Sequence, residues 1–149
     1  MKNNNSGVKT FTSTSSILIH ASVAKVWNAL VDPTIAKEYF MGAAVITDWK
    51  VGSPILFKGE FNRNQYQEKG VLLKVEPNVQ LQYSHWSPFD GLPDVQENYR
   101  TWSFNLSKKD KGILLAVSED SIPTEKQKNR SDEFWKGALE TLKKIVEKN

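Results

Sequence analysis

The chain has 149 residues and no cysteine, and its 20 basic and 17 acidic residues give a formal net charge of +3. This length suits one ordinary domain, and the lack of cysteine excludes disulfides, thiolate zinc sites and cysteine nucleophiles. Opposite charges are interspersed, so we expect no nucleic-acid partner. A cysteine-free chain is compatible with a reducing compartment, and we expect a cytoplasmic protein.

Residues 1–14 are interpreted as a flexible tail, and residues 15–149 as a single domain. The start of the tail is polar and rich in asparagine, unlike a signal peptide or a membrane anchor, so we expect no membrane insertion. A strand is predicted from Ser16 to His20, with Ile17 and Ile19 on one face because strand side chains alternate.

Two short helices are predicted next. Ser22 is placed to cap the first, because apolar residues follow it at the spacing of one helix face. These residues are Val23, Val26, Trp27 and Leu30. Asp32 and Pro33 favour the cap and first position of a second helix, which we expect to end near Gly42.

Between residues 44 and 120 the apolar pattern changes to a period of two, interrupted by turn signals. This pattern predicts an antiparallel sheet with one buried face, and the whole an α+β fold. The residues predicted to face inward are Ile55, Phe57, Phe61, Val71, Leu73, Val75, Val79, Leu81, Tyr83, Trp102, Phe104, Leu106, Ile113, Leu115 and Val117.

A long C-terminal helix is the clearest predicted element, because a continuous apolar stripe recurs at helical spacing. Its members are Phe134, Trp135, Ala138, Leu139, Leu142, Ile145 and Val146. Thr124 or Ser131 is placed to cap its start. Gly137 lies inside the helix, where glycine costs about 1 kcal/mol relative to alanine. We expect either close approach to the sheet or room for a ligand.

Four segments together resemble a known family: 26–30 (VWNAL), 47–55 (TDWKVGSPI), 69–72 (KGVL) and 75–77 (VEP). The chain is similar to the SRPBCC, or START-like, superfamily, and within it to the branch named after the C-terminal domain of the activator of the heat-shock protein 90 ATPase. The resemblance implies a helix-grip fold, in which a curved antiparallel sheet of about six or seven strands wraps around the C-terminal helix and leaves a deep cavity.

Members of this superfamily bind lipids, polyketides or other apolar compounds, a few are enzymes, and one subgroup serves the chaperone. The resemblance therefore implies binding or carriage of a small apolar ligand, lipid-like or an aromatic metabolite. An enzyme acting on an apolar substrate and a chaperone-interaction module are the alternatives. The residues specify no catalytic set, metal site or cofactor motif, so we expect a noncatalytic protein without cofactor. We expect a monomer or a homodimer.

Aromatic residues are the first candidates for a ligand site, since binding pockets are mostly apolar. The alternative for each is ordinary core packing. The candidates are Trp27, Phe40, Phe57, Phe61, Tyr83, Trp102, Phe104, Phe134 and Trp135. Trp135 is expected to pack toward Trp102 or Phe104 across the cavity.

Two polar residues complete the predicted site. His85 continues the inward phase of Tyr83, so it is placed to orient a polar group of the ligand, unless it is exposed at the strand end. Arg100 shares the phase of Trp102 and is placed to meet a ligand carboxylate or Glu119, unless it is solvated. Most other strand charges, including Glu60 and Glu97, are expected to face water.

Overall fold

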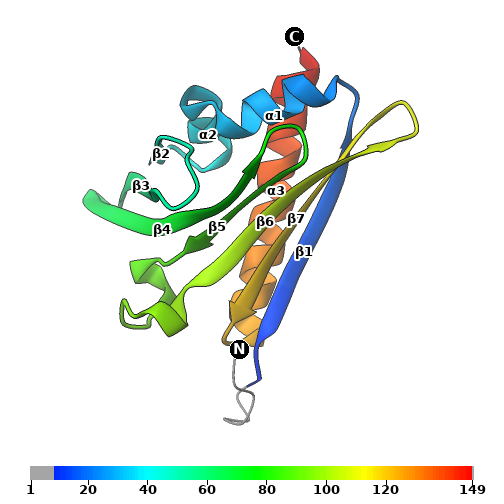
Figure 1. Cartoon of the computed structure of the whole chain (residues 1–149). Coiled ribbons are helices and arrows are strands. Elements are labelled where there is room, and N and C mark those ends of the chain that lie inside the picture. The colour runs from blue at the N-terminus through cyan, green and yellow to red at the C-terminus, as the bar shows by residue number, and fades with distance from the viewer. Residues whose placement is uncertain (1–8, 149) are drawn as a thin grey trace.

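The computed structural model describes residues 9–148, which form one sheet and three α-helices (Figure 1). In chain order the elements are β1 (Phe11–Ile19), α1 (Val23–Val31), α2 (Pro33–Tyr39), β2 (Ala44–Ile46), β3 (Pro54–Phe61), β4 (Asn64–Glu76), β5 (Gln80–His85), η2 (Pro88–Asp90), η3 (Gln96–Asn98), β6 (Arg100–Lys109), β7 (Gly112–Ile122) and α3 (Glu125–Lys148). The η elements are single 3₁₀ turns.

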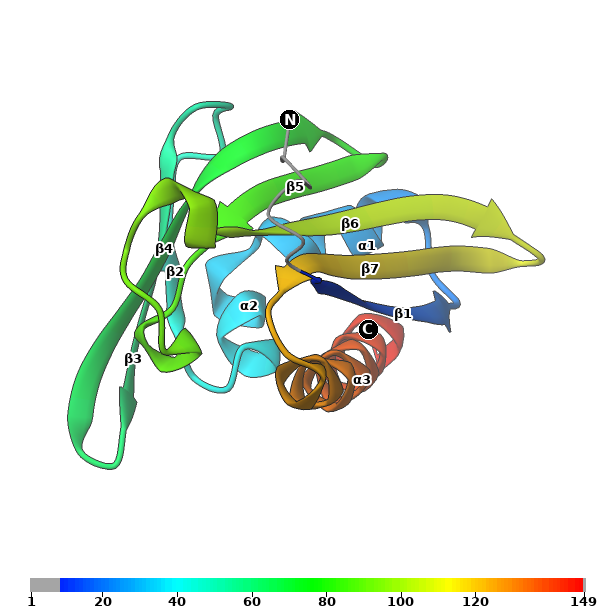
Figure 2. The ribbon, with the colours of Figure 1, turned by 90° about the horizontal axis from the view of Figure 1, so that it is seen from below.

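The seven strands form an antiparallel sheet in the order β1-β7-β6-β5-β4-β3-β2. Strands β2 to β7 follow one another as hairpins, and β1 lies beside β7. The sheet curves, and the three α-helices lie on its concave side (Figure 2). The predicted α+β helix-grip fold is therefore confirmed. The core fills the space between the concave face and the helices.

Local sequence signals set the helix boundaries. The Ser22 side chain accepts a hydrogen bond from the Lys25 amide, and the Asp32 side chain accepts one from the Thr34 amide, so both predicted caps are confirmed. After α2 the chain turns through Gly42, whose φ of 91° favours glycine. The helix itself ends at Tyr39, slightly earlier than predicted.

The long helix α3 begins at Glu125, and Thr124 Oγ1 accepts a hydrogen bond from the Gln127 amide at 3.1 Å. Thr124 is thus the cap, and Ser131 lies inside the helix. The predicted stripe faces the core through Trp135, Ala138, Leu139, Leu142 and Val146.

The first strand is longer than the sequence predicted. β1 begins at Phe11, and residues 11–14 pair with the end of β7, so this part of the predicted tail belongs to the sheet. The pattern missed it because residues 12–16 are all serine or threonine and carry no apolar alternation. Residues 1–8 of the predicted tail lie outside the described residues.

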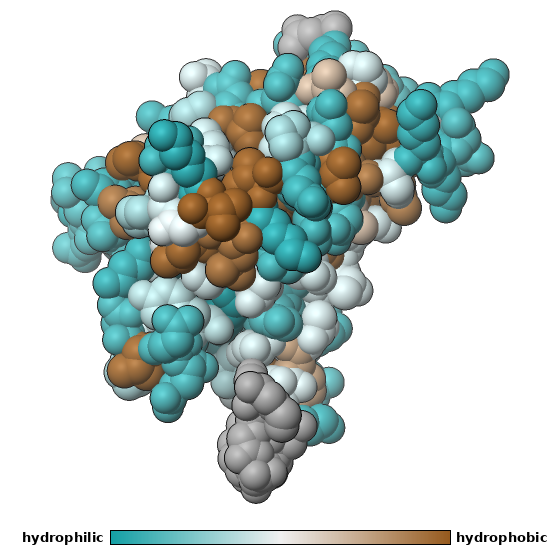
Figure 3. All heavy atoms as spheres, in the orientation of Figure 1, coloured by the Kyte–Doolittle hydropathy of each residue, from teal (hydrophilic) through white to brown (hydrophobic). Residues whose placement is uncertain are grey.

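Four residues predicted to face inward lie at the surface instead: Phe61, Val71, Leu73 and Val79. In β4 the buried side chain is Leu72, and the register shifts between Leu72 and Lys74. Three apolar residues in a row obscure the alternation, and a bulge changes its phase. Figure 3 shows hydrophobic surface gathered over this part of the sheet.

Gly137 satisfies neither explanation offered from the sequence. It is exposed, and a Cβ added to it would meet no other described residue within 4 Å. The close backbone approach lies elsewhere, at Gly70 in β4, where an added Cβ would fall 1.6 Å from the Ser84 carbonyl oxygen.

Candidate functional site

A cavity of about 460 Å³ opens between the end of α2, the β3–β4 hairpin, the ends of β5, β6 and β7, and the first half of α3. Its lining residues are Phe40, Met41, Ala43, Phe57, Glu60, Phe61, Tyr66, Glu68, His85, Ser87, Phe89, Asp90, Arg100, Trp102, Glu119, Gln127, Arg130, Ser131 and Phe134. The volume lies within the roughly 300–1,000 Å³ typical of small-molecule pockets.

Strand register assembles the wall of this cavity. His85 pairs with Arg100 across β5 and β6, and Trp102 pairs with Glu119 across β6 and β7. Because directly paired residues project from the same face of a sheet, these four side chains point together toward the helices. All four are more than nine-tenths buried, so the exposed alternatives for His85 and Arg100 are wrong.

Phe40 is the centre of the aromatic part of the site. Its ring centroid lies 5.4 Å from that of Phe57, 6.0 Å from that of Trp102 and 6.2 Å from that of Phe134. The His85 ring stacks on Trp102 with a centroid distance of 3.7 Å. Rings held against one another in this way make a rigid apolar surface.

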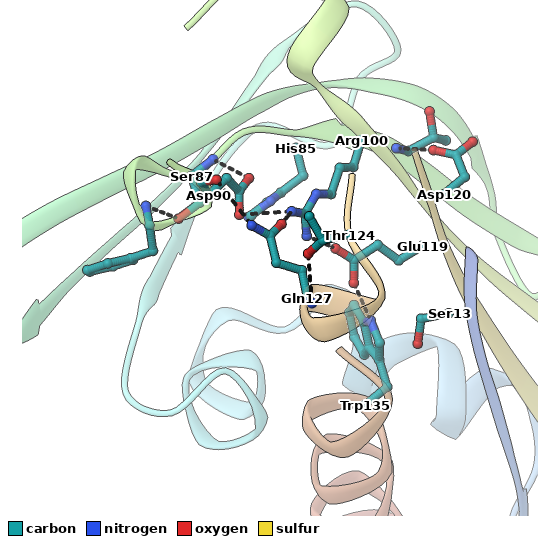
Figure 4. A network of polar contacts seen from close by, with 12 residues as sticks. Ser13, His85, Ser87, Asp90, Arg100, Glu119, Asp120, Thr124, Gln127 and Trp135 are labelled. Atoms are coloured by element: carbon teal, nitrogen blue, oxygen red, sulfur yellow. Dashed lines mark hydrogen bonds and ion pairs between the residues drawn. The ribbon is translucent and has the colours of Figure 1, made fainter. Parts of the chain in front are cut away.

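Both terminal nitrogens of the Arg100 guanidinium contact neighbouring oxygens (Figure 4). It donates from Nη1 to Glu119 Oε2 at 2.8 Å, and Nη2 reaches both Gln127 Oε1 and Asp90 Oδ1. The other oxygen of Glu119 accepts the indole N–H of Trp135 at 2.9 Å. This buried cation is therefore neutralised within the protein, and the predicted contact with Glu119 is the one that forms.

A second polar group adjoins the first. His85 Nε2 lies 3.0 Å from Glu68 Oε1, and Ser87 Oγ donates to Glu68 Oε2 at 2.7 Å. Burial by itself would raise the pKa of Glu68, but the hydrogen bond and charge of His85 and the hydrogen bond from Ser87 outweigh burial and lower it. Glu68 therefore favours the carboxylate form, which holds the imidazole ring in place.

Asp90 is the third carboxylate at this wall. The Ser87 side chain accepts from the Phe89 amide while Asp90 accepts from the Ser87 amide, a reciprocal cap that fixes η2 against the cavity. Burial raises the pKa of Asp90, although the Arg100 charge opposes the effect. The loop between β5 and β6 is thus built into the site.

Trp102 carries a polar group that the described residues leave unsatisfied. Its indole Nε1–H is buried and has no hydrogen-bond partner among residues 9–148. A buried donor without an acceptor costs about 1–3 kcal/mol. Such a group at the wall of a cavity calls for an explanation.

Seven of the eleven predicted site residues line the cavity: Phe40, Phe57, Phe61, His85, Arg100, Trp102 and Phe134. The other four, Trp27, Tyr83, Phe104 and Trp135, are buried in the core and do not line it. Trp135 packs against Trp102 and Phe104 at centroid distances of 4.8 and 5.6 Å, as the sequence predicted, but beneath the wall rather than across the cavity.

Sequence reasoning missed the carboxylates and their partners. Glu68 shares the β4 face of Leu72 and Gly70, and reading β4 in that phase would have placed it inward. Ser87 and Asp90 lie in a loop, and Gln127 lies in the first turns of α3 outside the apolar stripe. No periodicity applies to the two loop residues, whereas Gln127 precedes Phe134 by seven positions and so lies on the same face of the helix.

A second hollow of similar volume, about 450 Å³, lies over β1, β6 and β7. Small side chains such as Thr14, Ser16 and Ser118 line it, without aromatic or charged groups, so we assign the site to the aromatic cavity. Within residues 9–148, no set of three His, Asp or Glu side chains is arranged to hold a metal ion. None of the helices in the same range combines the length and hydrophobicity needed to cross a membrane.

The family described as activator of Hsp90 ATPase homolog 1-like protein matches residues 20–147. The chain belongs to this family. The comparison with curated proteins found no match. Membership confirms the resemblance read from the sequence, and with the fold it places the chain in the SRPBCC superfamily, whose fold commonly binds ligands.

Solved structures agree with this assignment. The solution structure of ChR145 from Cytophaga hutchinsonii is 40% identical, with a TM-score of 0.80 over 95% of this chain and 96% of that chain. The Aha1 dimer from Colwellia psychrerythraea is 20% identical, with a TM-score of 0.71 over 92% and 94% of the two chains. CalU16 from Micromonospora echinospora is 19% identical, with a TM-score of 0.70 over 93% and 85%. The last two show the fold alone.

Proposed function

We propose that this protein binds or carries a small apolar molecule in the aromatic cavity. The observation that carries the proposal is the composition of the cavity wall, in which the rings of Phe40, Phe57, Trp102 and Phe134 adjoin a compact polar group. Apolar walls with a few placed polar groups are typical of small-molecule sites. Burial of the ligand against these rings supplies affinity, and the polar group orients it.

The first test is to identify what the protein carries. Native mass spectrometry of protein purified from its own host should show a bound small molecule, and a screen of lipids and aromatic metabolites should raise the melting temperature. Protein that carries nothing, together with a screen in which no compound stabilises it, would remove support for the proposal.

A variant that fills the cavity locates the binding site. Ser131 lies on α3, lines the cavity and is half-buried, so Ser131→Phe should abolish binding while the fold remains. Lys136→Phe on the exposed side of the same helix is the matched control and should bind as the wild type does. Equal binding by both variants would place the ligand elsewhere.

An enzyme acting on the same apolar ligand is the alternative that the polar group favours. A histidine oriented by a carboxylate is a common general base, and His85 and Glu68 have this arrangement at the cavity wall. Recovering the ligand unchanged after prolonged incubation supports carriage. Conversion that His85→Gln abolishes while binding persists would support the enzyme.

A chaperone contact is the remaining alternative, and the family description supports it. The related structure from Colwellia psychrerythraea is described as a dimer, so a homodimer belongs to the same proposal. Binding to the chaperone and stimulation of its ATPase should be measured at low ionic strength, where electrostatic attachment is strongest. Absence of both would exclude this function.

A further inference from the structure

We propose that the ligand of this cavity is uncharged and presents a carbonyl-type oxygen that accepts the indole N–H of Trp102. The inference rests on the proposed function and specifies the chemical class of the ligand. It depends on two observations, one concerning the donor at the cavity wall and the other concerning the charges around it.

The donor is Nε1 of Trp102, which lacks a partner among the described residues although the indole lines the cavity. Indole offers a donor and no acceptor, so an oxygen or nitrogen lone pair has to satisfy it. The His85 ring stacks on one face of the indole and Trp135 meets it edge to face, so the side chain is held in place. The N–H is shielded from solvent, so neighbouring rings have to shift slightly as the ligand oxygen approaches it.

The charges of the lining exclude a carboxylate as that acceptor. Acidic residues outnumber arginines four to two among the lining residues, so carboxyl groups predominate over guanidinium groups at the wall. Arg100, which the sequence suggested as a partner for a ligand carboxylate, already contacts Glu119, Asp90 and Gln127. The other lining arginine, Arg130, is exposed on α3, so a carboxylate at the buried Trp102 N–H would meet no buried cation that is free to pair with it. A buried anion in that position is strongly disfavoured, whereas a neutral carbonyl oxygen satisfies the indole without that cost.

Three probes of the same size separate these requirements: acetylnaphthalene, isopropylnaphthalene and naphthoate. They share one ring system, and their substituents are a neutral acceptor, a hydrocarbon and a carboxylate. Trp102→Phe keeps an aromatic ring and removes the N–H. Trp27→Phe is the matched control, because Trp27 is equally buried and does not line the cavity.

Dissociation constants from NMR titration give the test. In the wild type naphthoate should bind most weakly. Trp102→Phe should weaken acetylnaphthalene about three- to tenfold relative to isopropylnaphthalene, the range of one hydrogen bond. Trp27→Phe should leave the ratio of these two constants unchanged. On the wild-type protein, the Trp102 indole proton should move downfield with acetylnaphthalene and not with isopropylnaphthalene, a readout that does not depend on the folding of a variant.

Each contrary outcome has a separate meaning. The inference is overturned if Trp102→Phe leaves the ratio of the acetylnaphthalene and isopropylnaphthalene dissociation constants unchanged and the indole proton does not distinguish the two probes. It is also overturned if naphthoate binds as tightly as acetylnaphthalene. In both cases apolar binding stands. If none of the three probes binds, isopropylnaphthalene included, the proposed function itself fails and this inference fails with it.

Discussion

Trp135 combines two roles that a helical stripe cannot distinguish. Its ring fills the core against Trp102 and Phe104, and its N–H supports the buried carboxylate of Glu119. Trp135→Ala should lower the free energy of unfolding by about 3–5 kcal/mol, as expected for loss of a large buried side chain. Trp135→Phe should lower it by about 1–3 kcal/mol, because one buried hydrogen bond is lost. Urea unfolding measures both values.

Ligand affinity of Trp135→Phe distinguishes a core residue from a pocket residue. Because Trp135 does not line the cavity, we expect the dissociation constant at a matched folded fraction to equal that of the wild type. A specific loss of affinity without a corresponding loss of stability would return Trp135 to the ligand site.

Glu68 makes stability depend on acidic pH. Its pKa is lower in the folded protein than the ordinary value of 4.5, so its contribution is present above the unfolded pKa and is lost as pH falls through the folded pKa. The free energy of unfolding should therefore fall less steeply below about pH 4.5 in Glu68→Gln than in the wild type. Denaturant unfolding at a series of pH values gives the slopes.

Asp90 lies in the same cavity, and its effect on the pH dependence of stability should be opposite to that of Glu68. Burial raises its pKa, so ionisation of Asp90 lowers stability as pH rises. Asp90→Asn removes that loss, so the free energy of unfolding should decline more steeply on acidification in the variant than in the wild type. If the free energy of unfolding changes with pH at the same slope in Glu68→Gln and Asp90→Asn, the two carboxylates do not have the opposite effects on stability that we expect.

At the scale of the element, α3 contains an exposed glycine that packing does not explain. Within the part of the chain that the structure describes, a Cβ at Gly137 meets no neighbour within 4 Å, and alanine is preferred in helix interiors by about 1 kcal/mol. Gly137→Ala should therefore raise the free energy of unfolding by about that amount, measured by urea or thermal unfolding, without a change in ligand affinity.

Gly70 in β4 is the contrasting control. Its added Cβ would overlap the Ser84 carbonyl oxygen of the neighbouring strand, so Gly70→Ala should destabilise the sheet. If Gly137→Ala were destabilising as well, α3 would have to meet another surface at Gly137.

At the scale of the whole molecule, the cavity is made by elements distant in the sequence. Arg100 on β6 meets Glu119 on β7, Asp90 in the β5–β6 loop and Gln127 on α3. The curvature of the sheet brings the β3–β4 hairpin toward the same region (Figure 2), where Glu68 reaches His85. A polar group assembled from so many elements exists only once the sheet and α3 have packed together.

The sequence by itself determined the helices, their caps, the antiparallel sheet and the inward faces of β6 and β7. These features follow from short-range spacing, turn residues and alternation, which the chain carries locally. It also placed Arg100 in phase with Trp102. Only the tertiary structure decided which aromatic rings line the cavity and which lie beneath it, because Trp102 and Trp135 have the same local signature of burial.

Tertiary structure likewise decided that Arg100 contacts Glu119, Asp90 and Gln127, and that the Trp102 N–H has no partner within residues 9–148. Hydrogen-bond satisfaction depends on where separate elements meet in space. Strand register, the bulge in β4 and the crossing of α3 over the sheet set those meeting points, and the periodicity of a single segment encodes none of them.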